Sequence, residues 1–155
     1  MAFRYIGLSP APFATLLALD DAALVARGMR RMIADKKPGF PCRVTLDDAE
    51  PGERVLLLPF EHQSAHSPYR AAGPIFVREG AQIAFDRAGP PPLSLVSRPL
   101  SVRAYAADGM MVDADVTPGE QLEPLLERFF GDGSVSYVHV HYARRGCYAG
   151  RVERA

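Results

Sequence analysis

Two histidines near the end of the chain have a spacing that allows them to act together. His139 and His141 are separated by one residue within residues 138–142, a stretch with the composition of a β-strand. Side chains alternate between the faces of a strand, so both imidazoles would point the same way. Such a pair can bind a metal ion, hold an anion, or act as general acid and base, and it can also be an ordinary polar pair on an exposed face. The spacing predicts where a function would lie without fixing a reaction.

The turn after these histidines decides whether Cys147 joins them. A three-residue loop of residues 144–146, with the glycine left-handed, pairs Ala143 with Cys147 and brings the thiol diagonally next to His141. A two-residue loop at 145–146 turns the thiol to the opposite face. In the first case the imidazole and the arginines favour the reactive thiolate, and in the second the thiol packs as a small apolar group. We predict His139, His141 and Cys147 as candidate catalytic residues, with a histidine as general base and the thiol as nucleophile.

The histidine pair also allows a metal site. It would need one or two further ligands, and the candidates are His62, His66, Glu61 and Asp113. A His-x-His strand resembles the metal sites of cupins, but the glutamate expected shortly after the pair is absent, and Ala143-Arg144-Arg145-Gly146 stands there instead. Two arginines beside a cation are unfavourable unless they hold an anionic substrate. The sequence therefore assigns no metal ligands, and a histidine-ligated metal-binding domain stays an alternative.

Several arginines lie in or near these segments and favour an anionic ligand. Arginine suits bidentate contact with carboxylates and phosphates. The polar stretch 61–70 lies between two apolar stretches, and loops in that position often carry binding residues. The alternative is a surface loop with scattered surface arginines. We predict ligand-binding roles for Cys42, Arg43, His62, His66, Tyr69, Arg70 and Arg144.

The composition excludes some classes of partner. Lys+Arg and Asp+Glu are 18 each among 155 residues, so the formal net charge is zero, which argues against a general nucleic-acid binder. The N-terminus shows no secretory signal, and no stretch approaches the length of a membrane span. We therefore expect a cytoplasmic protein whose two cysteines are reduced thiols. The sequence does not identify a cofactor and leaves the oligomeric state open.

The elements that would position these residues are mostly strands. Residues 54–61 predict a central strand, and residues 101–107 and 110–116 flank Asp108-Gly109 as a hairpin with one buried face. Residues 135–143 and 147–153 predict a second hairpin. Short helices follow Ser9-Pro10 and Asp20, and a helix over 118–130 contains Pro124, where we expect a kink or a restart. The pattern predicts an α+β fold in one domain over residues 1–155, with a mostly antiparallel sheet built from hairpins.

The whole chain resembles a bacterial family of small proteins known as domain of unknown function 1203. The resemblance rests on Pro38-Gly39-Phe40-Pro41-Cys42-Arg43, Asp48-Ala49-Glu50-Pro51-Gly52-Glu53, Glu61-His62-Gln63, Ser67-Pro68-Tyr69-Arg70-Ala71-Ala72-Gly73-Pro74-Ile75-Phe76-Val77-Arg78, Val138-His139-Val140-His141 and Gly146-Cys147-Tyr148-Ala149. It implies a free-standing bacterial protein but supplies no activity, cofactor or catalytic residue. The residues themselves predict a protein that binds a small anionic molecule in a pocket of His, Arg and Cys side chains, with histidine acid–base chemistry if it is an enzyme. The alternatives are a protein-interaction module and a histidine-ligated metal-binding domain.

Overall fold

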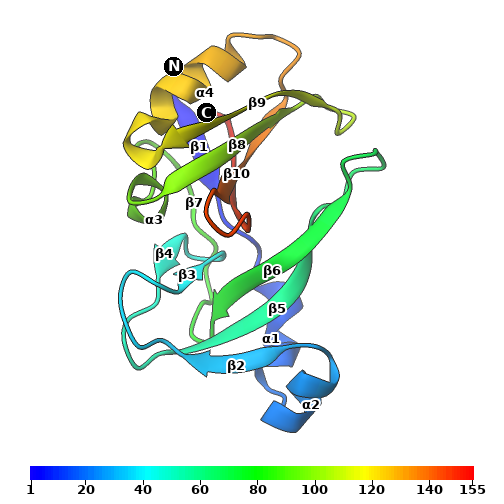
Figure 1. Cartoon of the computed structure of the whole chain (residues 1–155), viewed down its shortest axis with the longest axis vertical. Helices are drawn as coiled ribbons and strands as arrows, with labels where there is room; N and C mark the ends of the chain where they lie inside the picture. The colour runs from blue at the N-terminus through cyan, green and yellow to red at the C-terminus, as the bar shows by residue number, and fades with distance from the viewer.

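The computed structural model covers residues 1–155 and contains two β-sheets that lie against each other (Figure 1). The six-stranded sheet has the order β7-β1-β11-β10-β8-β9, and the five-stranded sheet has the order β2-β5-β6-β3-β4. All strand pairs are antiparallel except β3 with β6, which confirms the predicted α+β class with a mostly antiparallel arrangement. The strands are β1 (Phe3–Ile6), β2 (Arg30–Ile33), β3 (Pro41–Cys42), β4 (Asp47–Asp48), β5 (Arg54–Gln63), β6 (Ala71–Arg78), β7 (Asp86–Ala88), β8 (Pro99–Tyr105), β9 (Met111–Pro118), β10 (Tyr137–Tyr142) and β11 (Tyr148–Arg154).

The helices are short, and their ends follow the local sequence. They are α1 (Ala11–Leu17), α2 (Asp21–Ala26), α3 (Leu93–Val96), the 3₁₀ turn η1 (Gly119–Gln121) and α4 (Leu122–Phe130). Asp20 caps α2 by accepting a hydrogen bond from the Ala23 amide at 2.8 Å. The helix predicted over 118–130 restarts after η1, which places Pro124 in the first turn of α4, where its missing N–H costs no hydrogen bond. No helix has the length and apolar composition that a membrane span requires.

Helices cover the outer face of each sheet and leave the inner faces toward each other. In Figure 1 α4 lies above the six-stranded sheet, while α1 and α2 lie beside the lower, five-stranded one. The apolar side of α4 packs with Val138 and Val140 of β10 in one core. Phe13 of α1 and Leu24 of α2 pack with Leu56 of β5 in a second core. Because side chains alternate along β10, His139 and His141 lie on the face of that strand opposite α4.

Side-chain hydrogen bonds join the two sheets near that inner face. The Arg43 Nε atom, just after β3, donates to the carbonyl oxygen of Tyr148 in β11 at 2.7 Å. The Gln63 amide at the end of β5 donates to the Tyr137 hydroxyl of β10 at 3.0 Å. The Gln63 contact fixes the end of β5 against β10, the strand that carries the histidine pair, and the Arg43 contact ties the end of β3 to β11.

The hairpin of β8 and β9 differs from its prediction. Its position is confirmed, but the buried face predicted for residues 110–116 is wrong, because Val112 and Val116 remain 39% and 67% exposed. β9 is the edge strand of its sheet, and Val112 and Val116 stay outside the core that α4 forms with Leu100 and Val102 of β8. Apolar alternation indicates a strand here, but burial depends on which element lies opposite it.

Candidate three-histidine site

The hairpin of β10 and β11 closes at Tyr142 and Cys147, which leaves four residues, 143–146, in the turn. The Gly146 amide donates to the Tyr142 carbonyl at 2.7 Å, and the Tyr142 amide donates to the Cys147 carbonyl at 2.9 Å. Both predicted loop lengths, two and three residues, are therefore wrong, although Gly146 is left-handed as expected, with a φ of 77°. In this register Tyr148 is the partner of His141. Residues that pair directly share a face, so Tyr148 lies beside His141, and beyond a register shift Arg151 lies beside His139.

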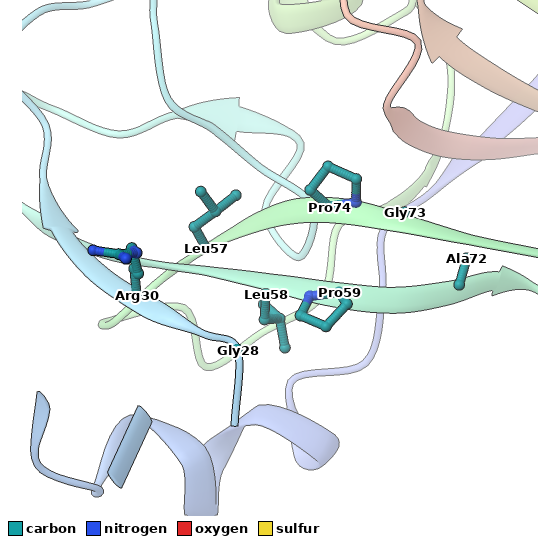
Figure 2. A pocket seen from close by; sticks show the side chains of 8 residues that line it. All are labelled: Gly28, Arg30, Leu57, Leu58, Pro59, Ala72, Gly73 and Pro74. Carbon is teal, nitrogen blue, oxygen red and sulfur yellow. The ribbon is translucent and has the colours of Figure 1, made fainter. Parts of the chain in front are cut away.

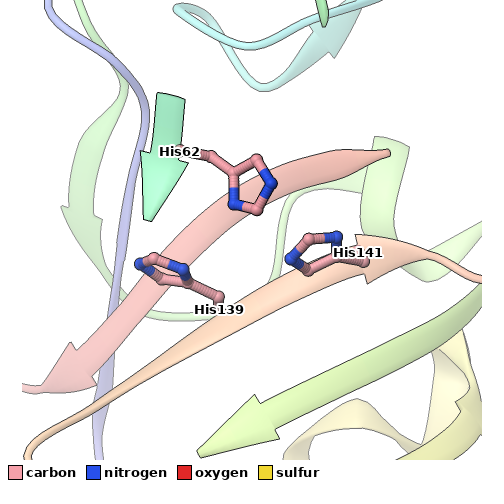
Figure 3. Close-up of side chains that lie close together, drawn as sticks. All are labelled: His62, His139 and His141. Atoms are coloured by element: carbon pink, nitrogen blue, oxygen red, sulfur yellow. The ribbon is translucent and has the colours of Figure 1, made fainter. Parts of the chain in front are cut away.

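Three histidines from two sheets meet between those sheets. His139 and His141 of β10 are 3% and 1% exposed, and His62 of β5 is half-buried beside them. The ring centroid of His62 lies 4.9 Å from that of His141 and 6.5 Å from that of His139. One nitrogen from each of the three residues can be chosen so that all lie within 4.8 Å of one another. We call these residues the histidine cluster; Figure 3 shows the rings turned toward a common space.

His62 reaches this position because β5 extends further than the sequence indicates. Residues 61–70 are predicted as a loop, but β5 continues to Gln63. Its pairing with β6 shifts register between Phe60 and Gln63. Such an irregularity changes the direction of the side chains within it, and here it includes His62. The hydrogen bond between Gln63 and Tyr137 then holds the end of the strand in place.

Each ring of the histidine cluster has a buried nitrogen without a hydrogen-bond partner. The Nδ1 atom of His141 lies 2.9 Å from the Gly146 carbonyl oxygen. A carbonyl oxygen only accepts, so Nδ1 carries the proton and Nε2 has the lone pair. This Nε2 atom, together with Nδ1 of His62 and Nδ1 of His139, is buried and unpartnered. Buried polar atoms without partners are uncommon and cost stability, so three in one place require an explanation.

Burial keeps these imidazoles neutral. It is the largest cause that lowers the pKa of His139 to about 3, with Arg151 as the next cause. Burial also lowers the pKa of His141 to about 4, although the hydrogen bond to Gly146 opposes the shift. The pKa of His62 is lowered by burial and then by the charge of Arg103. At neutral pH all three rings therefore offer lone pairs, the form in which imidazole binds a metal ion.

Tyrosine rings hold the histidines in place. Tyr148 stacks on His62, with centroids 5.4 Å apart and planes 6° from parallel. Tyr105 and Tyr137 contact His139, with centroids 5.3 and 5.2 Å away. Aromatic contacts of this kind restrict the rotation of the imidazoles, so the cluster is built into the packing between the sheets.

A pocket of about 310 Å³ opens beside the cluster. His62, His141 and Tyr148 form part of its wall, together with residues 71–74 of β6. Two arginines and a thiol complete it: Arg103, Arg145 and Cys147. Arg103 lies on β8 directly opposite His139. The arginines paired with carboxylates are Arg4, Arg31, Arg70, Arg78, Arg98, Arg128 and Arg151, so Arg103 and Arg145 keep their charges uncompensated by a salt bridge.

Four of the residues predicted from the sequence lie at this site. They are His62, His139 and His141 in the cluster and Cys147 in the pocket wall. The Cys147 thiol is half-buried, and its contact is with the Arg145 carbonyl oxygen, 3.8 Å from Sγ. Cys42 and Cys147 are both free thiols.

The other predicted residues lie elsewhere. Cys42 is buried, and its sulfur accepts a hydrogen bond from the Arg78 amide at 3.3 Å. Arg43 is buried between the carbonyls of Pro41 and Tyr148, where it joins the sheets. The predicted ligand-binding residues that are exposed and lie outside the pocket are His66, Tyr69, Arg70 and Arg144. The metal candidates Glu61 and Asp113 are exposed as well, and Glu61 forms a salt bridge with Arg70.

Sequence reasoning missed Arg103 and the role of Tyr148. Arg103 is the polar residue between Val102 and Ala104 in a predicted strand, so the alternation could have placed it on the face away from the core. Nothing in the sequence shows that β8 pairs with β10 and thereby sets Arg103 against His139. Tyr148 could be placed only once the length of the turn was known.

A larger hollow lies on another part of the five-stranded sheet (Figure 2). It measures about 380 Å³ and is lined mainly by backbone, proline and leucine side chains of β5 and β6. Arg30 is its single charged residue, and it contains no histidine or cysteine. This hollow therefore lacks the groups that chemistry or metal binding would require.

Comparison with known families agrees with the resemblance noted in the sequence. A family described as "Protein of unknown function (DUF1203)" matches residues 39–154. The chain belongs to the DUF1203 family. The matched region contains the whole histidine cluster and the pocket beside it, whereas β1, α1, α2 and β2 precede it. No curated protein matches the chain, and no solved structure matches it.

Proposed function

We propose that this DUF1203 protein binds a divalent transition-metal ion on His62, His139 and His141. The observation that supports the proposal is the convergence of three imidazoles from two sheets, with one nitrogen of each within 4.8 Å of the others. Each of these rings also has a buried nitrogen without a hydrogen-bond partner. A metal ion supplies the partner that each of these nitrogens lacks. Three imidazole ligands suit zinc, iron, copper or nickel better than magnesium or calcium, which prefer oxygen.

The geometry is compatible with a single ion. Imidazole nitrogens bind zinc at about 2.0–2.1 Å, so three of them around one tetrahedral ion lie about 3.4 Å apart. The separation of up to 4.8 Å in the cluster requires the ligand nitrogens to approach one another by up to about 1.4 Å when the ion binds. The Gly146 carbonyl bound to His141 Nδ1 matches the outer contacts that orient metal-binding histidines.

Three protein ligands leave a coordination position open. Closed structural zinc sites use four protein ligands, whereas catalytic sites use three and keep a place for water or substrate. The bound ion would supply a Lewis acid and an activated water. His139 and His141 then act as ligands, while Cys147 in the pocket wall stays available for the predicted nucleophilic role. The cytoplasm remains the proposed compartment.

Metal analysis of the purified protein tests this proposal. We expect one zinc, iron, nickel or copper ion per chain, or one equivalent of Co²⁺ taken up by chelator-treated protein with visible bands of a three-nitrogen site. Single replacements of His62, His139 or His141 by alanine should abolish stoichiometric uptake. His66→Ala is the matched control, because His66 lies four residues from His62 but is exposed. No uptake by the wild type, or equal loss in the His66 variant, contradicts the proposal.

A further inference from the structure

The charge around the histidine cluster determines what can occupy its open side. The cluster holds three neutral rings and no carboxylate, since Glu61 and Asp113 lie at the surface. A divalent ion bound there would keep its full double charge. Carboxylate-containing sites neutralise part of that charge with the protein, but here an incoming ligand has to do so.

Arg103 adds a second positive charge at the same place. It is half-buried on β8 opposite His139, and it lines the pocket. It has no carboxylate partner, and its charge is felt by all three histidines. A guanidinium held without a partner beside a buried site is the usual means of binding a carboxylate or phosphate through paired hydrogen bonds.

Arg145 adds a third positive charge to the pocket wall. It lies in the four-residue turn after β10, next to the Gly146 carbonyl that orients His141. Its neighbour Arg144 is also exposed in this turn but does not line the pocket. The two arginines therefore differ in position while sharing charge and exposure.

The rest of the pocket suits a small carbon skeleton. Residues 71–74 of β6 contribute alanine, glycine and proline, without charge. A volume of about 310 Å³ is at the lower end of the range for small-molecule sites. Such a pocket has room for more than a bare inorganic anion.

We infer that the pocket takes a small organic oxyanion, whose carboxylate or phosphate head occupies the open metal position between Arg103 and Arg145. This inference rests on the proposed metal centre. The class of ligand follows from the two guanidinium groups, which do not bind the metal ion.

The experiment uses the Co²⁺-loaded full chain and follows its visible bands during titration. Benzoate and phenyl phosphate are the probes, and benzamide is the neutral control with the same ring. We expect at least one of the two anions to shift the bands in a saturable titration. The anion that binds more tightly identifies the preferred head group. Arg103→Gln and Arg145→Gln should weaken the binding of that anion about tenfold or more, as expected for loss of a charge-assisted hydrogen bond. Arg144→Gln should stay within about twofold, because the change removes the same charge outside the pocket.

The outcomes separate this inference from the metal centre. If cobalt binds but neither anion shifts its bands, or benzamide binds as tightly as benzoate, the inference is wrong and the metal centre stands. The same holds if the Arg103 and Arg145 variants bind anion like the wild type, or if Arg144→Gln loses as much as Arg145→Gln. If cobalt does not bind to the wild type, both proposals fail. Arg145 lies in an exposed turn, so its variant gives a result even if Arg103→Gln fails to fold.

Discussion

Replacing His139 with leucine should make the protein more stable than the wild type without metal, and less stable than the wild type when metal is added. His139 is 3% exposed, and its Nδ1 atom is buried without a partner. Leucine has a similar size, is apolar, and can contact the surrounding rings of Tyr105 and Tyr148. The substitution therefore removes an unsatisfied polar atom and a metal ligand at the same time.

The two effects have estimable sizes. An unsatisfied buried polar atom costs about 1–3 kcal/mol, while a volume-conserving core substitution costs less than about 1.5 kcal/mol. In excess chelator the variant should therefore be more stable by about 1 kcal/mol, or about 2–4 °C in midpoint for a chain of this length. Metal at about 100 times its dissociation constant stabilises the wild type by about 2.7 kcal/mol, or about 5–11 °C. The variant has lost a ligand and gains little, so the wild type should then be more stable by about 2 kcal/mol.

Thermal and urea unfolding, each with chelator and with Zn²⁺, measure both states. His66→Leu is the control, since this exposed histidine should leave stability unchanged in both conditions. A variant that is less stable than the wild type in chelator would refute the reasoning about the unpartnered nitrogen. Equal stabilisation of both proteins by Zn²⁺ would refute the assignment of His139 as a ligand.

Three further predictions concern the ring that stacks on His62, the turn after β10, and an ion pair outside the site. Tyr148→Leu should weaken Co²⁺ binding by about 10–100-fold in a competition titration, because the ring that stacks on His62 is lost. Tyr148→Phe keeps a ring and should keep the wild-type affinity. Equal effects of the two substitutions would contradict the role of stacking. Gly146→Ala should lower the free energy of unfolding, measured in urea, by about 1–2 kcal/mol, because Gly146 has a left-handed backbone that strains an alanine. Gly133→Ala is the control and should leave the free energy unchanged, because that position is open. If Gly146→Ala is neutral as well, the turn does not strain an alanine. Asp48→Ala should cost about 3–5 kcal/mol in urea unfolding, because it leaves Arg98 half-buried without its partner. Burial alone would raise the pKa of Asp48, but hydrogen bonds from Arg98 and the Gly39 amide outweigh it and hold the folded-state pKa below the ordinary value of 3.8. The stabilisation from this shift is therefore present above pH 3.8 and is lost as the pH falls through the lowered pKa. The difference between the wild type and the variant should shrink in acid, and a constant difference would contradict this linkage.

Much of the secondary structure could be predicted because it depends on local patterns. The capping aspartate of α2, the Asp108-Gly109 hairpin and the terminal strands all have short-range signals, and the structure confirms their positions. Burial was less predictable, as β9 shows, since an apolar stripe is buried only where another element covers it. The end of β5 was missed because a register shift extends it through a stretch that looks polar.

The sequence by itself determined that His139 and His141 share one face of a strand, since strand alternation is a property of the backbone. It also placed a left-handed glycine in the following turn, which Gly146 occupies. Only the tertiary structure decided that His62 completes the cluster, because it comes from the other sheet, 77 residues before His139 in the numbering. It likewise decided that Tyr148 rather than Cys147 lies beside His141, since the longer turn pairs His141 with Tyr148 and a register shift between Val140 and His141 absorbs the additional residue.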